Sequence, residues 1–221
     1  MIGPAYFRAA VWSTLGCFLL SVPAVGAAER PTLVVTEGGR VSLRSKKATP
    51  SEFVSRADLL FVNPSSWWTV FPFGEIRKNL DGDGWSRIEA GAEFGVKPFH
   101  WFDDEKSSAY LKPLRWIYLG QGFHKAWLSP GNDTAEWETR VVFTAPLPWE
   151  IAAKPVEFYG VDEYTYDLEL GRGTRNEFGF GLKLPLPFEH FPLKTVIGFR
   201  HVDIVHEDDT DQFEGSLQAV F

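Results

Sequence analysis

The sequence has almost no cysteine and no concentrated positive charge. Only one of its 221 residues is a cysteine, Cys17, and it lies in an N-terminal segment expected to be removed. The mature fold would therefore form without disulfide bonds. The formal net charge is −7, and no run of lysine or arginine stands out. Because binding to nucleic acid requires a clustered basic surface, no nucleic-acid partner is expected.

Long hydrophobic runs are also missing after that N-terminal segment. The longest later stretch without a charge covers residues 59–74, and it contains Asn63, Pro64 and Pro72. A spanning helix needs about 20 consecutive apolar residues. Any location within a membrane must then come from strands closed into a barrel, where every backbone polar group finds a partner. The 19 phenylalanines and 9 tryptophans, together with 20 glycines and 15 prolines, favour a β-rich protein.

Residues 1–28 have the pattern of a signal for export across a bacterial inner membrane. Arg8 is the only charged side chain in this segment, and the residues after it are mainly apolar and then small. Small residues at the −3 and −1 positions favour cleavage after Ala27 or Ala28. Two alternatives are an uncleaved membrane anchor and a lipoprotein-type cut at Cys17.

Alternation of apolar and polar residues predicts strands from Trp85 onward. Residues 85–97, 135–145 and 175–184 place apolar side chains on one parity and charged residues or glycine mainly on the other. This period of two is the signature of a strand with two different faces. Residues 111–123, 156–170 and 193–205 are less regular. In the second of these Asp162 falls among the apolar positions, which indicates a bulge or a wrong parity.

The connections between these segments are of two alternating kinds. One kind is polar and covers residues 129–134, 171–176 and 206–211. The other carries a repeated proline-aromatic phrase at residues 97–99, 147–149 and 186–188. Two kinds of turn at alternate ends are expected for an up-and-down barrel with one end in the periplasm and the other outside the cell.

The last predicted strand, residues 212–221, ends on Phe221. Phe213, Leu217 and Ala219 share its parity, with the smaller Gly215 between them. This end resembles the terminal strand of Gram-negative outer-membrane β-barrel proteins, which finish on phenylalanine with apolar residues at every second position. The resemblance implies recognition by the barrel-assembly machinery and contact with periplasmic chaperones in transit. It also implies outer-membrane lipids and lipopolysaccharide as lasting partners.

The expected fold class is therefore all-β, an antiparallel up-and-down transmembrane β-barrel of eight strands. The eighth strand is placed within residues 59–73, and ten strands result if residues 32–44 add a hairpin. Residues 49–52, Thr-Pro-Ser-Glu, resemble a helix capping box and predict a short periplasmic helix. The expected division is a signal peptide at residues 1–28, a periplasmic segment at 29–58 and the barrel at 59–221.

Charged residues on the inward parity are the main candidate site. They are Arg87, Glu89, Glu93, Glu136, Glu138, Arg140, Arg175, Glu177, Lys183 and Glu214. In a small barrel such side chains fill the lumen and neutralise one another as an ion-paired plug. The alternative is a narrow polar pore or a small-ligand cavity, which needs a wider barrel.

A second candidate is a calcium loop. Asn79, Asp81 and Asp83 occupy positions 1, 3 and 5 of an EF-hand-like pattern, but Ala90 replaces the closing glutamate and Glu89 comes one place early. A turn before a strand explains the same residues. We therefore expect no metal and no cofactor.

A third candidate is an acidic cluster at the last polar loop. Its members are His201, His206, Glu207, Asp208, Asp209 and Asp211. A histidine with a carboxylate could serve a lipid-modifying enzyme of the acyl hydrolase or transferase type, but neither Ser129 nor Ser216 is marked as a nucleophile. A solvated loop bridged to lipopolysaccharide by divalent cations is the simpler reading.

The sequence favours a non-enzymatic outer-membrane barrel with a structural, binding or limited permeation role. Fold alone does not choose among these roles. The lipid-modifying enzyme and a soluble periplasmic β-barrel or sandwich remain as alternatives.

Overall fold

The computed structural model describes residues 31–43, 51–61, 67–81, 85–103, 108–128, 132–188, 192–205 and 209–221. The expected signal peptide, with its cleavage positions at Ala27 and Ala28, lies outside the described residues. The same holds for Asp83 of the calcium candidate and for residues 206–208 of the acidic cluster.

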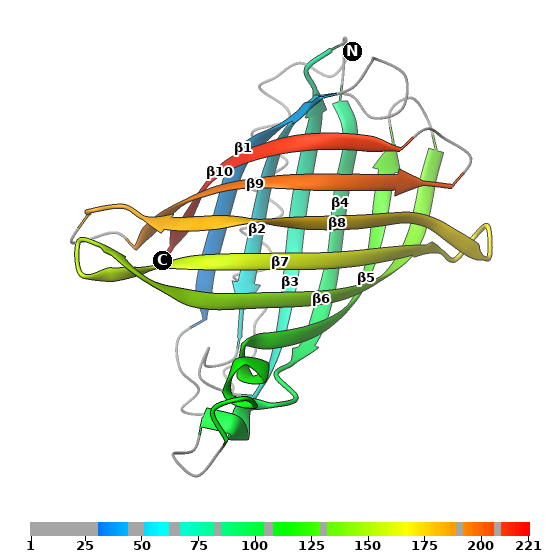
Figure 1. The fold of residues 1–221 in the computed structure, drawn as a ribbon. Helices are drawn as coiled ribbons and strands as arrows, with labels where there is room; N and C mark the ends of the chain where they lie inside the picture. Colours follow the sequence, from blue (N-terminus) through cyan, green and yellow to red (C-terminus); the bar gives the residue numbers. More distant parts are fainter. Residues whose placement is uncertain are drawn as a thin grey trace. The chain divides into compact units, whose positions relative to one another are not determined.

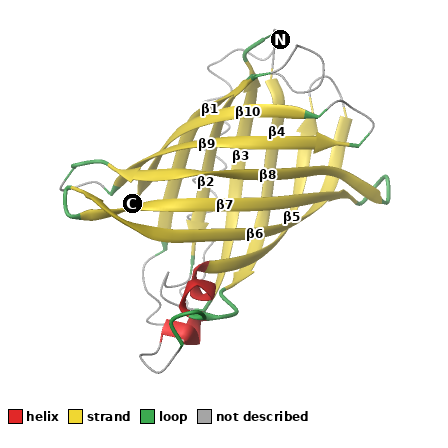
Figure 2. Ribbon diagram, viewed as in Figure 1, coloured by secondary structure: helices red, strands yellow, loops and turns green. Residues whose placement is uncertain are grey.

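The described chain forms ten strands in one closed antiparallel barrel (Figures 1 and 2). The strands are β1 (Thr32–Ser42), β2 (Glu52–Leu60), β3 (Trp68–Asn79), β4 (Trp85–Val96), β5 (Ile117–Leu128), β6 (Asn132–Ile151), β7 (Lys154–Asp167), β8 (Arg172–Pro185), β9 (Leu193–Ile204) and β10 (Thr210–Val220). Each strand pairs with its neighbours in sequence, and β10 pairs with β1. The expected all-β antiparallel barrel is thus confirmed, with the ten strands of the alternative count.

The two ends of the barrel differ. At one end Leu33 and Phe221 exchange two backbone hydrogen bonds of 3.1 and 2.8 Å, which join the start of β1 to the end of the chain. We call this the terminal end and the opposite one the far end. The short 3₁₀ helices η1 (His100–Asp103) and η2 (Lys112–Trp116) lie between β4 and β5 at the terminal end. All three proline-aromatic phrases also lie at this end, as predicted, but residues 147–149 belong to β6, and the turn follows them at Ala152 and Ala153.

The N-terminal part of the barrel differs from the sequence prediction. Residues 32–42 and 52–60 are strands β1 and β2 of the barrel wall, so the barrel includes most of the segment that we had assigned to the periplasm. The predicted helix at residues 49–52 is wrong at its described end, because Glu52 begins β2. The strand predicted within residues 59–73 is β3, which begins at Trp68 and extends to Asn79.

The outer and inner faces of the wall carry different kinds of side chain, because alternate residues of each strand point outward and inward. On the outside, seven large apolar side chains are between 42% and 51% exposed: Phe94, Phe123, Trp137, Tyr164, Phe178, Phe180 and Phe213. On the inside, charged residues of the same strands are buried, among them Glu89, Glu93 and Glu177. Alternate residues point to opposite faces of a strand, so one sequence pattern produces both surfaces.

Asp162 is an exception on the outer surface. The register of β7 runs through it without a break, from Val141 on β6 to Phe178 on β8. Neither a bulge nor a wrong parity explains this carboxylate, which is exposed on the outward face beside Tyr164. Within the described residues, no helix is long and apolar enough to cross a membrane.

Candidate functional site in the barrel lumen

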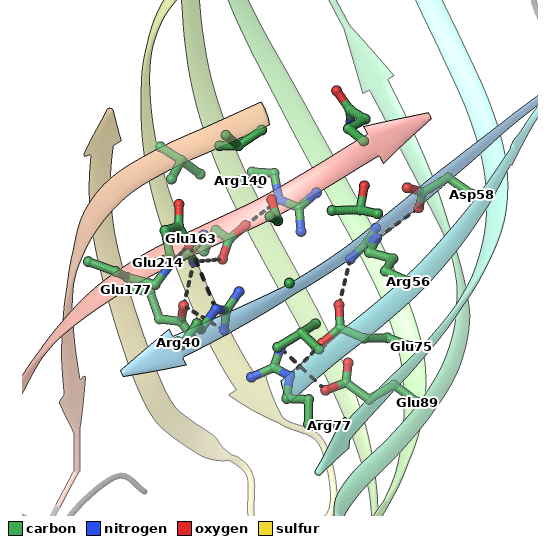
Figure 3. Close-up of a pocket in the computed structure, with 18 of the residues that line it drawn as sticks. Arg40, Arg56, Asp58, Glu75, Arg77, Glu89, Arg140, Glu163, Glu177 and Glu214 are labelled. Carbon is green, nitrogen blue, oxygen red and sulfur yellow. Dashed lines mark hydrogen bonds and ion pairs between the residues drawn. The ribbon is translucent and has the colours of Figure 1, made fainter. Parts of the chain in front are cut away.

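The lumen contains a cavity of about 280 Å³. Its lining includes eight basic side chains and seven acidic ones (Figure 3). The basic residues are Arg40, Arg56, Arg77, Arg87, Arg140, Arg175, Lys183 and Arg200. The acidic residues are Asp58, Glu75, Glu89, Glu138, Glu163, Glu177 and Glu214. A surface this polar requires either mutual pairing or water.

One group of ion pairs covers the wall from β2 to β6. Arg56 lies 2.8 Å from Asp58 and 3.4 Å from Glu75. Arg140 binds Glu93 at 3.1 Å and Glu138 at 2.8 Å. The remaining ion pairs of this group are Arg56–Glu93, Arg77–Glu75, Arg77–Glu89, Arg87–Glu89 and Arg87–Glu136. His124 Nε2 lies 3.4 Å from Glu89 and 3.1 Å from Glu136 and belongs to the same group. The arginines and carboxylates of this group neutralise one another both within strands and across the lumen face of several strands.

A second group covers the wall from β8 through β10 to β1. Arg200 donates to Glu177 at 2.5 Å and to Glu214 at 3.2 Å. Arg40 lies 3.9 Å from Glu177 and 3.7 Å from Glu214. Arg175 also pairs with Glu177. Three arginines therefore share two carboxylates.

Glu163 on β7 joins the two groups. One of its carboxylate oxygens lies 2.8 Å from Arg140 Nε, and the other accepts a hydrogen bond of 2.8 Å from Arg200 Nη1. Through this carboxylate the ion pairs, together with His124, form one connected set that includes side chains from all ten strands. We call this set the lumen network. Buried pairs of this kind depend on their geometry, because each charge has lost its contact with bulk water.

Two tyrosines reach members of the lumen network by lying across glycines. A Cβ added at Gly198 would lie 2.2 Å from the Tyr159 hydroxyl, and one at Gly95 would lie 1.9 Å from that of Tyr118. Tyr159 donates to Glu214, and Tyr118 donates to Glu93 at 2.8 Å. The glycines are needed here because any side chain would occupy the space of the ring.

Only some of the lumen-facing residues near each end of the barrel line the cavity. At the far end the lumen-facing Glu52, Val202, Thr210 and Gln212 are buried, and none of them lines the cavity. At the terminal end the half-buried Thr36, Lys183, Val196, Ser216 and Gln218 do line it. We call these five residues the vestibule. Arg77, Arg87, Thr165 and Arg175 also line the cavity, and each lies within three residues of the far end of its strand, so the lining reaches toward both ends.

The structure brings together all ten charged residues predicted for the lumen. Eight of them line the cavity, and the other two join through ion pairs, Glu93 with Arg140 and Glu136 with Arg87. Lys183 lines the cavity without a recorded ion pair among the described residues. The arrangement has the geometry of the paired plug, with the cavity left beside it.

Several members of the lumen network, and the two tyrosines that donate to it, were not predicted. They are Arg40, Arg56, Asp58, Glu75, Arg77, Tyr118, His124, Tyr159, Glu163 and Arg200. The first five lie on β1 to β3, where no parity had been assigned. Glu163 was detectable, because it lies between Asp162 and Tyr164 and so has the inward parity of β7.

The calcium candidate forms a turn. Asn79 accepts a hydrogen bond of 2.7 Å from the backbone N–H of Asp81, and Asp81 accepts one of 2.7 Å from the N–H of Ser51. Across the described residues, no group of three potential ligands could hold a metal ion. The two side chains stabilise the turn that follows β3 and link it to Ser51, just before β2.

The acidic cluster at the last loop is only partly described. His201 Nδ1 lies 2.9 Å from Asp211, and His201 Nε2 lies 4.0 Å from Asp209. Ser216 lines the cavity, whereas His201 is 43% exposed and has the outward parity of β9, so these two side chains lie on different faces of the wall. Ser129 lies outside the described residues. Ser216 therefore does not form a catalytic pair with this histidine.

Comparisons with known proteins identify no family for this chain. No protein-family model matches the chain, and no curated protein matches it either. Among solved structures, the chain is similar to the NanC porin, with a TM-score of 0.38 and 12% identity over 86% of this chain and 98% of that one. A likeness this distant leaves the lumen and its role to be judged from the residues of this chain.

Proposed function

We propose that this chain is an integral outer-membrane β-barrel whose narrow, ion-paired lumen allows limited permeation of small ions. The observation that carries the proposal is the reversed chemistry of the wall. Large apolar side chains point outward and are exposed, while the interior contains the lumen network. A soluble barrel would bury its apolar face and expose its charges, so this reversal favours lipid outside and water inside.

Two further features support the membrane location. Trp67, Trp68, Trp149 and Phe188 are exposed at the terminal end, where an interfacial belt of aromatic residues would meet lipid headgroups. On β10 and directly after it, Phe213, Leu217 and Phe221 are between 49% and 61% exposed, and Ala219 shares their parity. We propose that these four residues are the signal for membrane assembly.

The permeation role rests on the size and lining of the cavity. Fifteen charged side chains line about 280 Å³, roughly nine times the volume of one water molecule in the liquid. Open porin channels are built from 16 to 18 strands, and this barrel has ten. Small ions fit such a lumen, and larger solutes do not.

The membrane location is tested by extraction and gel migration. We expect the protein to leave the cell-envelope fraction only with detergent and to migrate faster in SDS gels when it is not boiled. Release as a soluble monomer without detergent would contradict the proposal.

The permeation role is tested by conductance in planar bilayers. We expect small conductance steps from the wild-type protein and larger ones from Glu163→Ala, which removes the connection between the two groups of ion pairs. Lys125→Ala, on the outward face, is the matched control and should conduct as the wild type does. If neither the wild type nor Glu163→Ala conducts, the barrel has no permeation role.

A further inference from the structure

Lys183 differs from the other cations of the cavity. Each of the seven arginines that line it has a carboxylate within 4 Å, whereas no ion pair with Lys183 is recorded within the described parts of the chain. Its ammonium nitrogen lies 5.6 Å from the centre of the Tyr159 ring. Lys183 is thus a half-buried cation that contacts an aromatic ring and has no paired anion among the residues that the structure describes.

The nearby carboxylates are already engaged. Glu157, which is opposite Lys183 in the strand register, lies 2.7 Å from Lys194. Glu214 accepts hydrogen bonds from Tyr159 and Arg200. Neither carboxylate is left to neutralise Lys183 alone.

The other polar groups of the vestibule lie on β10 and β1, and β9 separates them from Lys183 on β8. Val196 on β9 is opposite Lys183 in the register, and Ser216 on β10 is opposite Val196. Gln218 and Thr36 form a pair two positions closer to the terminal end. Among the described residues, no hydrogen bond is recorded for the side chains of Thr36, Ser216 or Gln218. One ammonium, two hydroxyls and one amide, from β8, β10 and β1, therefore line the part of the cavity toward the terminal end.

We infer that the vestibule binds a small oxyanion, a carboxylate or a phosphate, at Lys183. The ammonium supplies the charge, and the hydroxyls of Thr36 and Ser216 and the amide of Gln218 supply further hydrogen-bond donors. Lysine binds such anions as a compact point charge. The site deepens the proposed function, since it names the class of solute that enters the lumen, and it rests on the lumen being accessible.

Isothermal titration calorimetry of the full-length protein in an uncharged detergent tests the site. The probes are inorganic phosphate, acetate, and phosphatidylglycerol added to the micelles. We expect saturable binding that Lys183→Gln weakens at least tenfold. Binding of dissolved phosphate or acetate identifies a free anion, and binding of phosphatidylglycerol alone identifies a lipid headgroup.

Lys125→Gln is the matched control, because it removes a lysine from the outward face of β5, where Lys125 is exposed. Its affinity should equal that of the wild type. Absence of saturable binding to the wild type, or equal binding by Lys183→Gln, would overturn the inference. If Lys183→Gln does not fold, the double variant Ser216→Ala with Gln218→Ala decides: unchanged affinity overturns the site, and a severalfold loss supports it.

Calorimetry and conductance fail independently. Binding without conductance would keep the anion site and remove the permeation role. Conductance without binding would keep the permeation role and remove the anion site.

Discussion

The inner and outer surfaces of this barrel use charge in different ways. Inside, Arg200 has three carboxylate partners, Glu163, Glu177 and Glu214, and its side chain is 8% exposed. Outside, Lys125 and Asp133 form an ion pair at 3.2 Å with the two side chains 47% and 52% exposed. The inner pairs are shared and shielded from water, while the outer pair stands alone in contact with its surroundings. Similar distances should therefore correspond to very different energies.

The largest difference should follow removal of a shared cation. Arg200→Ala leaves three carboxylates short of a partner within the lumen, and an uncompensated buried charge typically costs about 3–5 kcal/mol. We expect the free energy of unfolding to fall by about that amount. Urea unfolding of the protein folded into lipid vesicles, followed by tryptophan fluorescence, measures it.

The control for this variant is Lys183→Ala, which removes a lumen cation without a recorded carboxylate partner in the described structure. Its cost should be about 1 kcal/mol or less, as for substitutions that break no buried network. Equal losses in the two variants would mean that the shared ion pairs contribute no more than an isolated cation does.

A smaller effect is expected where the inner surface depends on close packing. In Gly198→Ala the new methyl group would lie 2.2 Å from the Tyr159 hydroxyl and 2.8 Å from the Phe180 carbonyl oxygen. Tyr159 must then move away from Glu214. Overpacking of this kind costs about 1–3 kcal/mol, to be measured in the same unfolding experiment.

Gly215→Ala provides the matched comparison on the outer surface. A Cβ at Gly215 meets nothing within 4 Å, so the free energy of unfolding should change by no more than about 0.5 kcal/mol. If Gly215→Ala were as costly as Gly198→Ala, then the contact with Tyr159 would not be the reason for the glycine at position 198.

The difference between the surfaces also explains how much of the fold could be predicted. Strands β4, β6 and β8 were recognisable because, over residues 87–96, 136–145 and 175–184, the charged residues have one parity and the aromatic residues the other. The alternation of apolar and polar residues is weaker in strands β1 and β2. Their outward positions include Glu37, Gly39, Ser55 and Ala57, which are small or charged rather than large and apolar. The period of two is therefore weak in β1 and β2, the strands that make the difference between eight strands and ten.

The candidate site was predictable only in part for a related reason. Inward charges such as Glu89 and Glu177 follow directly from parity, once a strand is assigned. Which charges pair depends on neighbours distant in sequence, as for Arg200 with Glu163 across β8. The unpaired state of Lys183 has no local signature at all, since it depends on Lys194 engaging Glu157.

The smallest effect is expected for the outer ion pair. Lys125→Ala and Asp133→Ala should each lower the free energy of unfolding by about 0.2–1 kcal/mol, because exposed pairs gain little in water. The two variants are not equivalent: Lys125 also lies 5.9 Å from the centre of the Trp127 ring, a contact that Asp133→Ala leaves intact. Any excess loss in Lys125→Ala therefore measures that contact.

Salt separates this outer pair from the inner ones. In about 1 M NaCl the screening length falls to about 3 Å, so the effect of Asp133→Ala should vanish, while that of Arg200→Ala should largely persist because buried pairs are screened much less. Unfolding of both variants at low and high salt measures this. If the loss in Arg200→Ala vanished with salt as well, the lumen network would be as accessible to ions as the outer surface is. Its tight pairing would then not be what restricts permeation.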